Sequence, residues 1–137
     1  MFNKILLASD GSEFAVRATE EAIEIAKCNP KTVIHVVYVS EDSKSDVLQN
    51  WNTLGVQEQR KQLVRPSVEK IENADIKYEI EFLHGEPGPS IVKHANENNF
   101  DLVVVGSRGR NRFQELVLGS VSHKVAKRAN CAVMIIK

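Results

Sequence analysis

Apolar positions along this chain follow two different periods. Short runs rich in valine, isoleucine and leucine are separated by longer stretches in which apolar residues return every three or four positions. The first pattern predicts β-strands and the second predicts amphipathic helices. The predicted strands span 4–9, 32–39, 76–83, 101–105 and 132–136. The predicted helices span 13 to the Asn29-Pro30 break, 58–73, the stretch after the turn at 85–89, and 119–129.

Two features leave the start of the second helix open. Residues 40–57 are polar, with Trp51 and Leu54 isolated and Gly55 breaking the run, which predicts a mobile connection with room for some helix. Pro66 lies inside the helix and is expected to kink it or to mark its true start.

The order of these elements indicates an α/β fold in a single domain covering residues 1–137. Strands that alternate with helices form a parallel sheet with helices on both faces. Ligands of such sheets bind at the carboxyl ends of the strands, where the strand order reverses. Asp10 follows the first predicted strand, and Gly106 to Gly109 follow the fourth. If these two strands are neighbours, both segments open into one crevice.

The segment from Val103 to Ser120 carries the clearest chemical signal. Its apolar run ends in Gly106-Ser107-Arg108-Gly109, and nine residues later Gly119-Ser120 opens a predicted helix. Glycine lets the backbone approach an anion closely, and the N–H groups of turns and helix N-termini bind phosphate. A plain turn and an ordinary helix cap explain the same residues without a ligand. Their combination favours phosphate binding.

Charge and composition narrow the class of ligand. The chain has 137 residues, 42% of them apolar, with 18 basic and 18 acidic side chains and no formal net charge. Nothing global therefore favours nucleic acid or an acidic membrane surface as a partner. Between Gly106 and Asn130, however, six basic residues accompany a single acidic one. This local field fits an anionic ligand beside the glycines.

The lack of a recognisable targeting signal and the spacing of the cysteines predict a cytoplasmic protein. The N-terminal residues do not resemble a signal peptide, and no apolar stretch is long enough to span a membrane. Cys28 and Cys131 lie far apart in sequence, with no second cysteine or histidine at metal-binding spacing, which predicts two free thiols.

Catalytic and metal chemistry have weak support in the sequence. The chain lacks the Gly-Lys-Ser/Thr signature of a P-loop, an evident pair of catalytic carboxylates and a nucleophile beside a base. His84, His94 and His123 are scattered, and His35 lies in an apolar run that favours a core or edge position. We therefore expect no catalytic residue and no metal site.

Several motifs resemble those of the universal stress protein family over essentially the whole chain. They are the Asp10 ending of the first strand, Ile34-His35-Val36-Val37, the Gly85-x-Pro87 turn, and Gly106-x-x-Gly109 with nine residues before Gly119-Ser120. The glycine pattern resembles that of the ATP-binding branch. This resemblance implies a Rossmann-like sheet of the adenine nucleotide alpha-hydrolase type, with five parallel strands in the order 3-2-1-4-5. It also implies a homodimer and a site for ATP, with Mg²⁺ expected alongside.

The same resemblance implies roles by position. Asp10 would contact the ribose or the adenine, although it also fits an ordinary turn in which Ser12 caps the next helix. Val36 would offer backbone groups to adenine. The positions that would hold the phosphates are Gly106, Gly109, Gly119, Ser120 and Val121. Segment 40–57 departs from a common form of the family in length and polarity, which leaves the covering of the nucleotide open.

Three functions remain open at this stage: a nucleotide-dependent regulator of the stress response, a slow ATP hydrolase, and a nucleotide-free dimeric interaction module. The regulator is favoured, because nothing in the sequence demands turnover. The downstream protein partner stays unknown. The apolar strand at 132–136 is expected at a sheet edge, where it would pair with a second copy. Val133 and Ile135 should face one side and Met134 and Ile136 the other, one set on helices and one on the partner.

Overall fold

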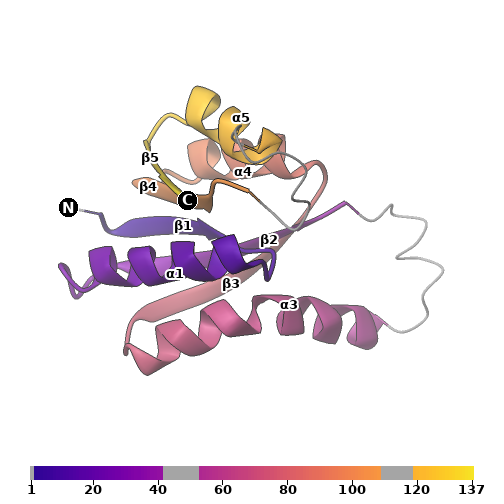
Figure 1. Cartoon of the computed structure of the whole chain (residues 1–137), viewed down its shortest axis with the longest axis horizontal. Coiled ribbons are helices and arrows are strands. Elements are labelled where there is room, and N and C mark those ends of the chain that lie inside the picture. The colour runs from indigo at the N-terminus through magenta and orange to yellow at the C-terminus, as the bar shows by residue number, and fades with distance from the viewer. Residues whose placement is uncertain (1, 42–52, 109–118) are drawn as a thin grey trace.

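Strands and helices alternate along the protein (Figure 1), whose computed structural model describes residues 2–41, 53–108 and 119–137. The strands are β1 (Lys4–Ala8), β2 (Val33–Ser40), β3 (Lys77–His84), β4 (Leu102–Gly106) and β5 (Ala132–Ile136). The helices are α1 (Glu13–Ala26), α3 (Thr53–Asn73), α4 (Pro87–Glu97) and α5 (Ser120–Arg128). Every strand boundary lies within one residue of its prediction. Predictions for 42–52 and 109–118 lie outside the described residues.

The five strands form one parallel sheet in the order β3-β2-β1-β4-β5, which confirms the order implied by the family resemblance. β1 is central, because Leu6 pairs with His35 of β2 on one side and with Val103 of β4 on the other. Asp10 and Gly106 therefore come at the ends of neighbouring strands. The strand order reverses between these two strands, and open parallel sheets bind ligands at such a point.

Alternate side chains of the central strands enter two cores, one on each face of the sheet. Leu7 and Val36 lie in the core covered by α1 and α3, whereas Leu6 and Val37 lie in the core covered by α4 and α5. Figure 1 shows these two pairs of helices on opposite sides of the sheet. All four side chains are at most 1% exposed, and burial of each stabilises the fold by about 1.5–3 kcal/mol.

Helix α1 begins as predicted. Ser12 is its N-cap, and the Ser12 hydroxyl accepts a hydrogen bond from the Ala15 N–H at 3.2 Å. Small buried residues, among them Ala18 and Ala22, let the helix lie close to the sheet. Across the described ranges, no helix has both the length and the hydropathy that a bilayer span requires.

Helix α3 begins earlier than predicted and continues through Pro66. The expected start was residue 58 or Pro66 itself, but the helix spans Thr53–Asn73. Proline lacks the N–H that bonds the carbonyl four residues back, which costs a helix interior about 3 kcal/mol. Val64, Val68 and Ile71 are buried in the core covered by this helix. Their burial offsets the proline, so the helix is not interrupted.

Candidate functional site

A cavity of about 450 Å³ opens at the carboxyl ends of β1, β2 and β4. Its volume is typical of small-molecule sites, and its position is the one expected for ligands of an open parallel sheet. The N-termini of α1, α4 and α5 also border it. Its lining includes Ser9, Asp10 and Ser12 after β1, Val37, Tyr38 and Val39 on β2, Ser107 and Arg108 after β4, and Gly119 to Ser122 at the start of α5.

The turn after β1 both caps α1 and brings Asp10 to the cavity. The Asp10 carboxylate accepts a hydrogen bond from the Ser12 N–H at 2.9 Å, and Ser12 in turn caps the helix. Gly11 between them has a φ of +80°, and a Cβ there would lie 2.7 Å from the Leu63 carbonyl oxygen of α3. Only glycine adopts this φ without strain and leaves room for the Leu63 carbonyl oxygen. The capping and ligand-binding interpretations of Asp10 are therefore compatible.

Three buried hydroxyl groups beside the cavity tie β1, α1 and α3 together. Ser67 Oγ lies 2.9 Å from Ser9 Oγ and 2.8 Å from Thr19 Oγ1, and the Thr19 hydroxyl also lies 2.7 Å from the Ala15 carbonyl oxygen. All three hydroxyl side chains are at most 3% exposed. Because an unpaired buried hydroxyl is costly, this network fixes Ser9 and with it the neighbouring Asp10.

The Ser107 carbonyl oxygen anchors the start of α5. It accepts hydrogen bonds from the Gly119 N–H at 2.8 Å and from the Ser122 hydroxyl at 3.1 Å. The Ser107 N–H donates to the Ile136 carbonyl of β5 at 2.7 Å. Gly119 is the N-cap of α5 and has no side chain that could cap the helix. The positive end of the helix dipole is thus presented to the cavity that Gly119 to Ser122 line.

The absence of a side chain at Gly106 is needed for the packing of α1, whether or not a ligand is bound. A Cβ at this position would lie 2.7 Å from the Phe14 Cβ of α1 and 3.1 Å from the Arg108 carbonyl oxygen. The sequence indicated that this glycine allows a phosphate to approach. The structure adds that α1 packs directly against the end of β4, although Gly106 also lines the cavity. A substitution at Gly106 is therefore expected to disturb the packing of the fold, whatever its effect on ligand binding.

An ion pair joins α4 to α5 beside the cavity. Lys124 Nζ lies 2.7 Å from Glu86 Oε1, and Glu86 precedes Pro87, which lines the cavity. The hydrogen bond and the charge of Lys124 hold the pKa of Glu86 below its usual value. This contact links the N-cap of α4 to the middle of α5 beside the cavity.

The structure brings most of the predicted site residues to this one cavity. Those that line it are Asp10, Gly106, Gly119, Ser120 and Val121. Gly109 lies outside the described residues. Val36, which was expected to contact adenine, is 0% exposed and lies in the core covered by α1 and α3, not in the cavity lining.

The position of Val36 follows from the register of the sheet. Ala8 pairs with Val37, so the β2 residues level with Asp10 lie beyond Val37. Tyr38 and Val39 accordingly line the cavity. Apolar patterning does not report strand register, which is why these residues were missed. Strand β2 runs to Ser40 and so extends beyond the end of β1. This extra length is the signal that could have indicated Tyr38 and Val39.

The sequence profile of the universal stress protein family matches residues 1–137. The chain belongs to this family. Universal stress protein YxiE of Bacillus subtilis is 32% identical to this universal stress protein, over 100% of both chains. Universal stress protein MJ0577 of Methanocaldococcus jannaschii is 30% identical over 100% of this chain and 96% of its own.

Solved structures of universal stress proteins share this fold. The structure of MJ0577 has a TM-score of 0.85 to this protein at 25% identity, covering 100% of this chain and 96% of the other. The universal stress protein from Archaeoglobus fulgidus in complex with dAMP has a TM-score of 0.73 at 24% identity, covering 100% and 98%. An adenine nucleotide is thus a ligand of at least one protein with this fold.

Proposed function

We propose that this universal stress protein binds an adenine nucleotide, ATP with Mg²⁺, in the cavity at the ends of β1 and β4 and acts as a nucleotide-dependent regulator of the stress response. The observation that carries the proposal is that Asp10 and the N-terminus of α5, whose N-cap has no side chain, line one cavity. A carboxylate suits the hydroxyls of a ribose, and a helix N-terminus suits a phosphate. The dAMP complex of the relative from Archaeoglobus fulgidus supports the same class of ligand.

The chemistry of the cavity lining suggests which part of the cavity holds the nucleoside and which part holds the phosphates. Asp10 and the apolar wall formed with Val39 and Ile91 take the nucleoside end. Arg108 and the first turn of α5 take the phosphates, because a guanidinium and backbone N–H groups both bind phosphate oxygens. Gly109 remains in the proposal as a phosphate-binding position.

Mg²⁺ would enter with the triphosphate. In nucleotide sites this ion typically uses phosphate oxygens together with one or two carboxylates. With Asp10 at the nucleoside end, Glu41 is the carboxylate of the described cavity lining that is left for such an ion.

The proposed assembly is a homodimer through β5. This strand lies at the edge of the sheet, and an apolar edge strand favours pairing with another copy. Side chains from both of the expected sets pack against the cores under the helices. Val133 packs on the core covered by α4 and α5, whereas Met134 and Ile136 pack on the core covered by α1 and α3. Pairing with a second copy would therefore use the backbone N–H and C=O groups along the free edge of β5, together with the exposed parts of these side chains.

The proposed compartment is the cytoplasm. Cys28 and Cys131 are both free thiols, as is usual for proteins of a reducing compartment. Burial raises the pKa of the Cys131 thiol, which lowers its reactivity.

Calorimetric titration with ATP, with and without Mg²⁺, tests the proposal. Thermal unfolding in the same ligands gives an independent readout, since a ligand of the native state stabilises it by about 2.7 kcal/mol at a hundredfold excess over Kd. Native mass spectrometry of freshly purified protein should reveal a co-purified adenine nucleotide, and ADP accumulating with time would indicate a slow hydrolase. Folded protein that binds no ATP at millimolar concentration contradicts the proposal and favours the interaction module.

A further inference from the structure

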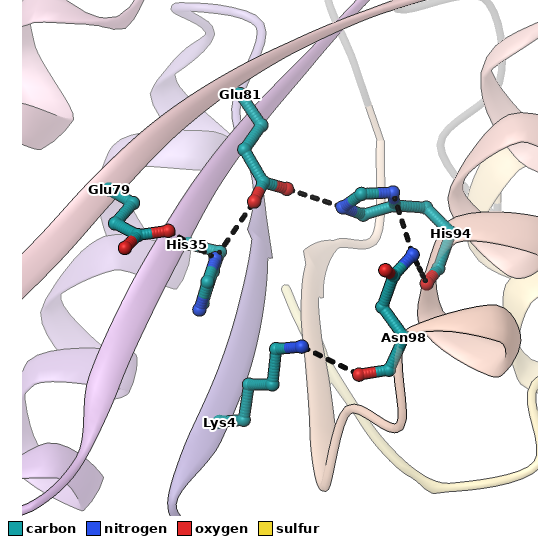
Figure 2. Close-up of polar contacts among 6 residues, drawn as sticks. All are labelled: Lys4, His35, Glu79, Glu81, His94 and Asn98. Atoms are coloured by element: carbon teal, nitrogen blue, oxygen red, sulfur yellow. Dashed lines mark hydrogen bonds and ion pairs between the residues drawn. The ribbon is translucent and has the colours of Figure 1, made fainter.

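Two histidines and two glutamates from three elements meet on the face of the sheet covered by α4 (Figure 2). His35 comes from β2, Glu79 and Glu81 from β3, and His94 from α4. His35 Nδ1 lies 3.0 Å from Glu81 Oε1 and 3.4 Å from Glu79 Oε2. The second carboxylate oxygen of Glu81, Oε2, pairs with Nε2 of His94. We call these four residues the His–Glu cluster.

Strand register assembles the cluster from residues that the sequence scatters. His35 pairs with Glu79 across β2 and β3. Residues two apart on a strand share a face, so Glu81 joins Glu79 on the side of His35. Helix α4 then brings His94 to Glu81, which the sequence spacing of the histidines did not indicate.

The cluster is separate from the nucleotide cavity and open to solvent. None of its four residues, all of which are described, is in the cavity lining. The His35 side chain is 9% exposed, whereas that of Glu79 is 64% exposed. A buried imidazole nitrogen thus faces two carboxylates, one of which lies at the surface. One imidazole can neutralise at most one of these two negative charges.

Further contacts fix the orientation of both imidazole rings. Asn98 Nδ2 lies 2.9 Å from the His94 carbonyl oxygen and 3.3 Å from His94 Nδ1. An amide nitrogen only donates, so Nδ1 of His94 accepts, and Nε2 carries the proton directed at Glu81. The Phe100 ring packs against both imidazoles, with centroids 4.9 Å from His35 and 5.4 Å from His94.

The nearby ammonium group of Lys4 has other partners (Figure 2). Lys4 Nζ donates to the Asn98 carbonyl oxygen at 2.6 Å and lies 4.5 Å from the centroid of the Phe100 ring. These contacts direct the Lys4 ammonium group to Asn98 and Phe100 and not to the carboxylates of the cluster.

The spacing of the cluster atoms is close to that of metal ligands. Tetrahedral coordination with bonds of about 2.0–2.2 Å places ligand atoms about 3.3–3.6 Å apart. The two separations from His35 Nδ1 are 3.0 and 3.4 Å, and the ligand atoms of all three residues lie within 4.8 Å of one another. We propose that His35, Glu79 and Glu81 bind a divalent transition-metal ion of the zinc class, and that His94 positions Glu81.

The donor set accounts for the class of ion. One imidazole and two carboxylates suit Zn²⁺ and its neighbours, whereas Ca²⁺ and Mg²⁺ favour sites made of oxygen ligands alone. On binding, Nδ1 of His35 gives up its proton and Nε2 carries the one ring proton that remains, so the ring is neutral and the Nδ1 lone pair goes to the ion. Glu81 offers one oxygen to the ion and keeps the other for the His94 N–H, an arrangement that orients metal-bound carboxylates. A fourth position is left for water.

The ion would clamp the edge strand β3 to β2 and, through His94, to α4. Charged residues that point inward on an edge strand also discourage pairing between copies. If the cluster serves only that purpose, it binds no ion. Zinc binding therefore separates the two explanations.

Titration of chelator-treated protein with Zn²⁺, followed by calorimetry, tests the proposal, and Co²⁺ followed by visible absorption reports the geometry. We expect one ion per chain, the intense absorption of tetrahedral Co²⁺ and a higher melting temperature in Zn²⁺. Glu79→Gln and Glu81→Gln each remove a charged ligand oxygen while keeping the side-chain size. Each should weaken Zn²⁺ binding by about tenfold or more. Glu79 is exposed, so the first variant should fold normally.

His84→Ala and His123→Ala are matched controls, because they remove exposed histidines outside the cluster and should leave Zn²⁺ affinity unchanged. His94→Ala should weaken binding about 10–100-fold with the tetrahedral Co²⁺ spectrum retained. His94→Gln keeps an N–H donor and should restore part of the affinity. The proposal is overturned if wild-type protein binds no Zn²⁺, if binding survives both glutamate substitutions, or if a control histidine proves necessary.

Discussion

Gly106 and Gly119 both line the cavity proposed for the nucleotide, but each is a glycine for its own reason. The Phe14 Cβ of α1 occupies the space that a side chain at Gly106 would need, 2.7 Å from the position of a Cβ. At Gly119 the nearest atom is the Ser107 carbonyl oxygen, 3.1 Å from such a Cβ, which accepts the Gly119 N–H and seats the helix. Substitutions at these glycines should change the packing as well as any ligand binding, so single hydroxyl groups give clearer tests of the ligand.

Ser120→Ala is the clearest of these tests, because the residue is exposed at the start of α5 and lines the cavity. A hydrogen bond to a charged phosphate oxygen is worth roughly 1.5–3 kcal/mol, so ATP affinity should fall about ten- to a hundredfold. Adenosine affinity should not change. Asp10→Ala is the matched variant at the nucleoside end and should weaken both ligands. Calorimetry decides, and an equal loss of adenosine affinity in Ser120→Ala would contradict the assignment of the phosphate end.

Gly106→Ala should lower the free energy of unfolding by about 1–3 kcal/mol, the usual cost of overpacking, because its Cβ would lie 2.7 Å from that of Phe14. Gly88→Ala is the control. Its Cβ would meet the Lys124 side chain, with Cδ at 2.9 Å and Cβ at 3.2 Å, so the flexible end of that side chain moves and α5 shifts only slightly. Alanine also favours the helix by about 0.5–1 kcal/mol. Urea unfolding compares the two variants. Equal stabilities would mean that α1 moves away from β4 at little cost.

Secondary-structure elements could be predicted where a local pattern delimits them. The apolar run of β5 spans Ala132–Ile136 as predicted, because the polar residues Asn130 and Lys137 bracket it. The start of α3 was missed, because residues 53–57 lack the apolar repeat that marks a buried helix face. The register that sets His35 opposite Glu79 has no signature in either strand alone. The strand ends therefore indicated where the cavity lies, whereas the His–Glu cluster could be found only once the fold was known.

The contact of α3 with β1 depends on the Ser67 hydroxyl. Ser67→Ala should destabilise the fold by about 1–3 kcal/mol, because it leaves the buried Ser9 hydroxyl without its partner. ATP affinity should also fall, though less than in Asp10→Ala, since Ser9 lines the cavity. Ser120→Ala, an exposed serine, serves as the stability control. Denaturant unfolding measures both, and a Ser67→Ala protein as stable as wild type would show that the network adds nothing to the fold.

At the scale of the whole molecule, one sheet carries three separate surfaces. The cavity proposed for the nucleotide lies at the ends of the central strands, the His–Glu cluster lies toward the β3 edge, and β5 forms the opposite edge. Alternation of strands and helices predicted the parallel sheet, but only the family resemblance supplied the strand order. Because the three surfaces share no residue, changes at one should leave ligand binding at the others intact.

The β5 edge makes the homodimer a testable property of the whole molecule. Light scattering at micromolar concentration should give twice the monomer mass, since the apolar strand leaves a backbone edge for a second copy. Val133→Asp should shift the protein toward monomer by placing two like charges at the interface. Val133 also packs on the core covered by α4 and α5, so Ala132→Lys, at an exposed position of the same strand, is the second variant. Circular dichroism must show that both remain folded. A monomer mass for the wild type would exclude the dimer, and an unchanged dimer in both folded variants would move the interface away from β5.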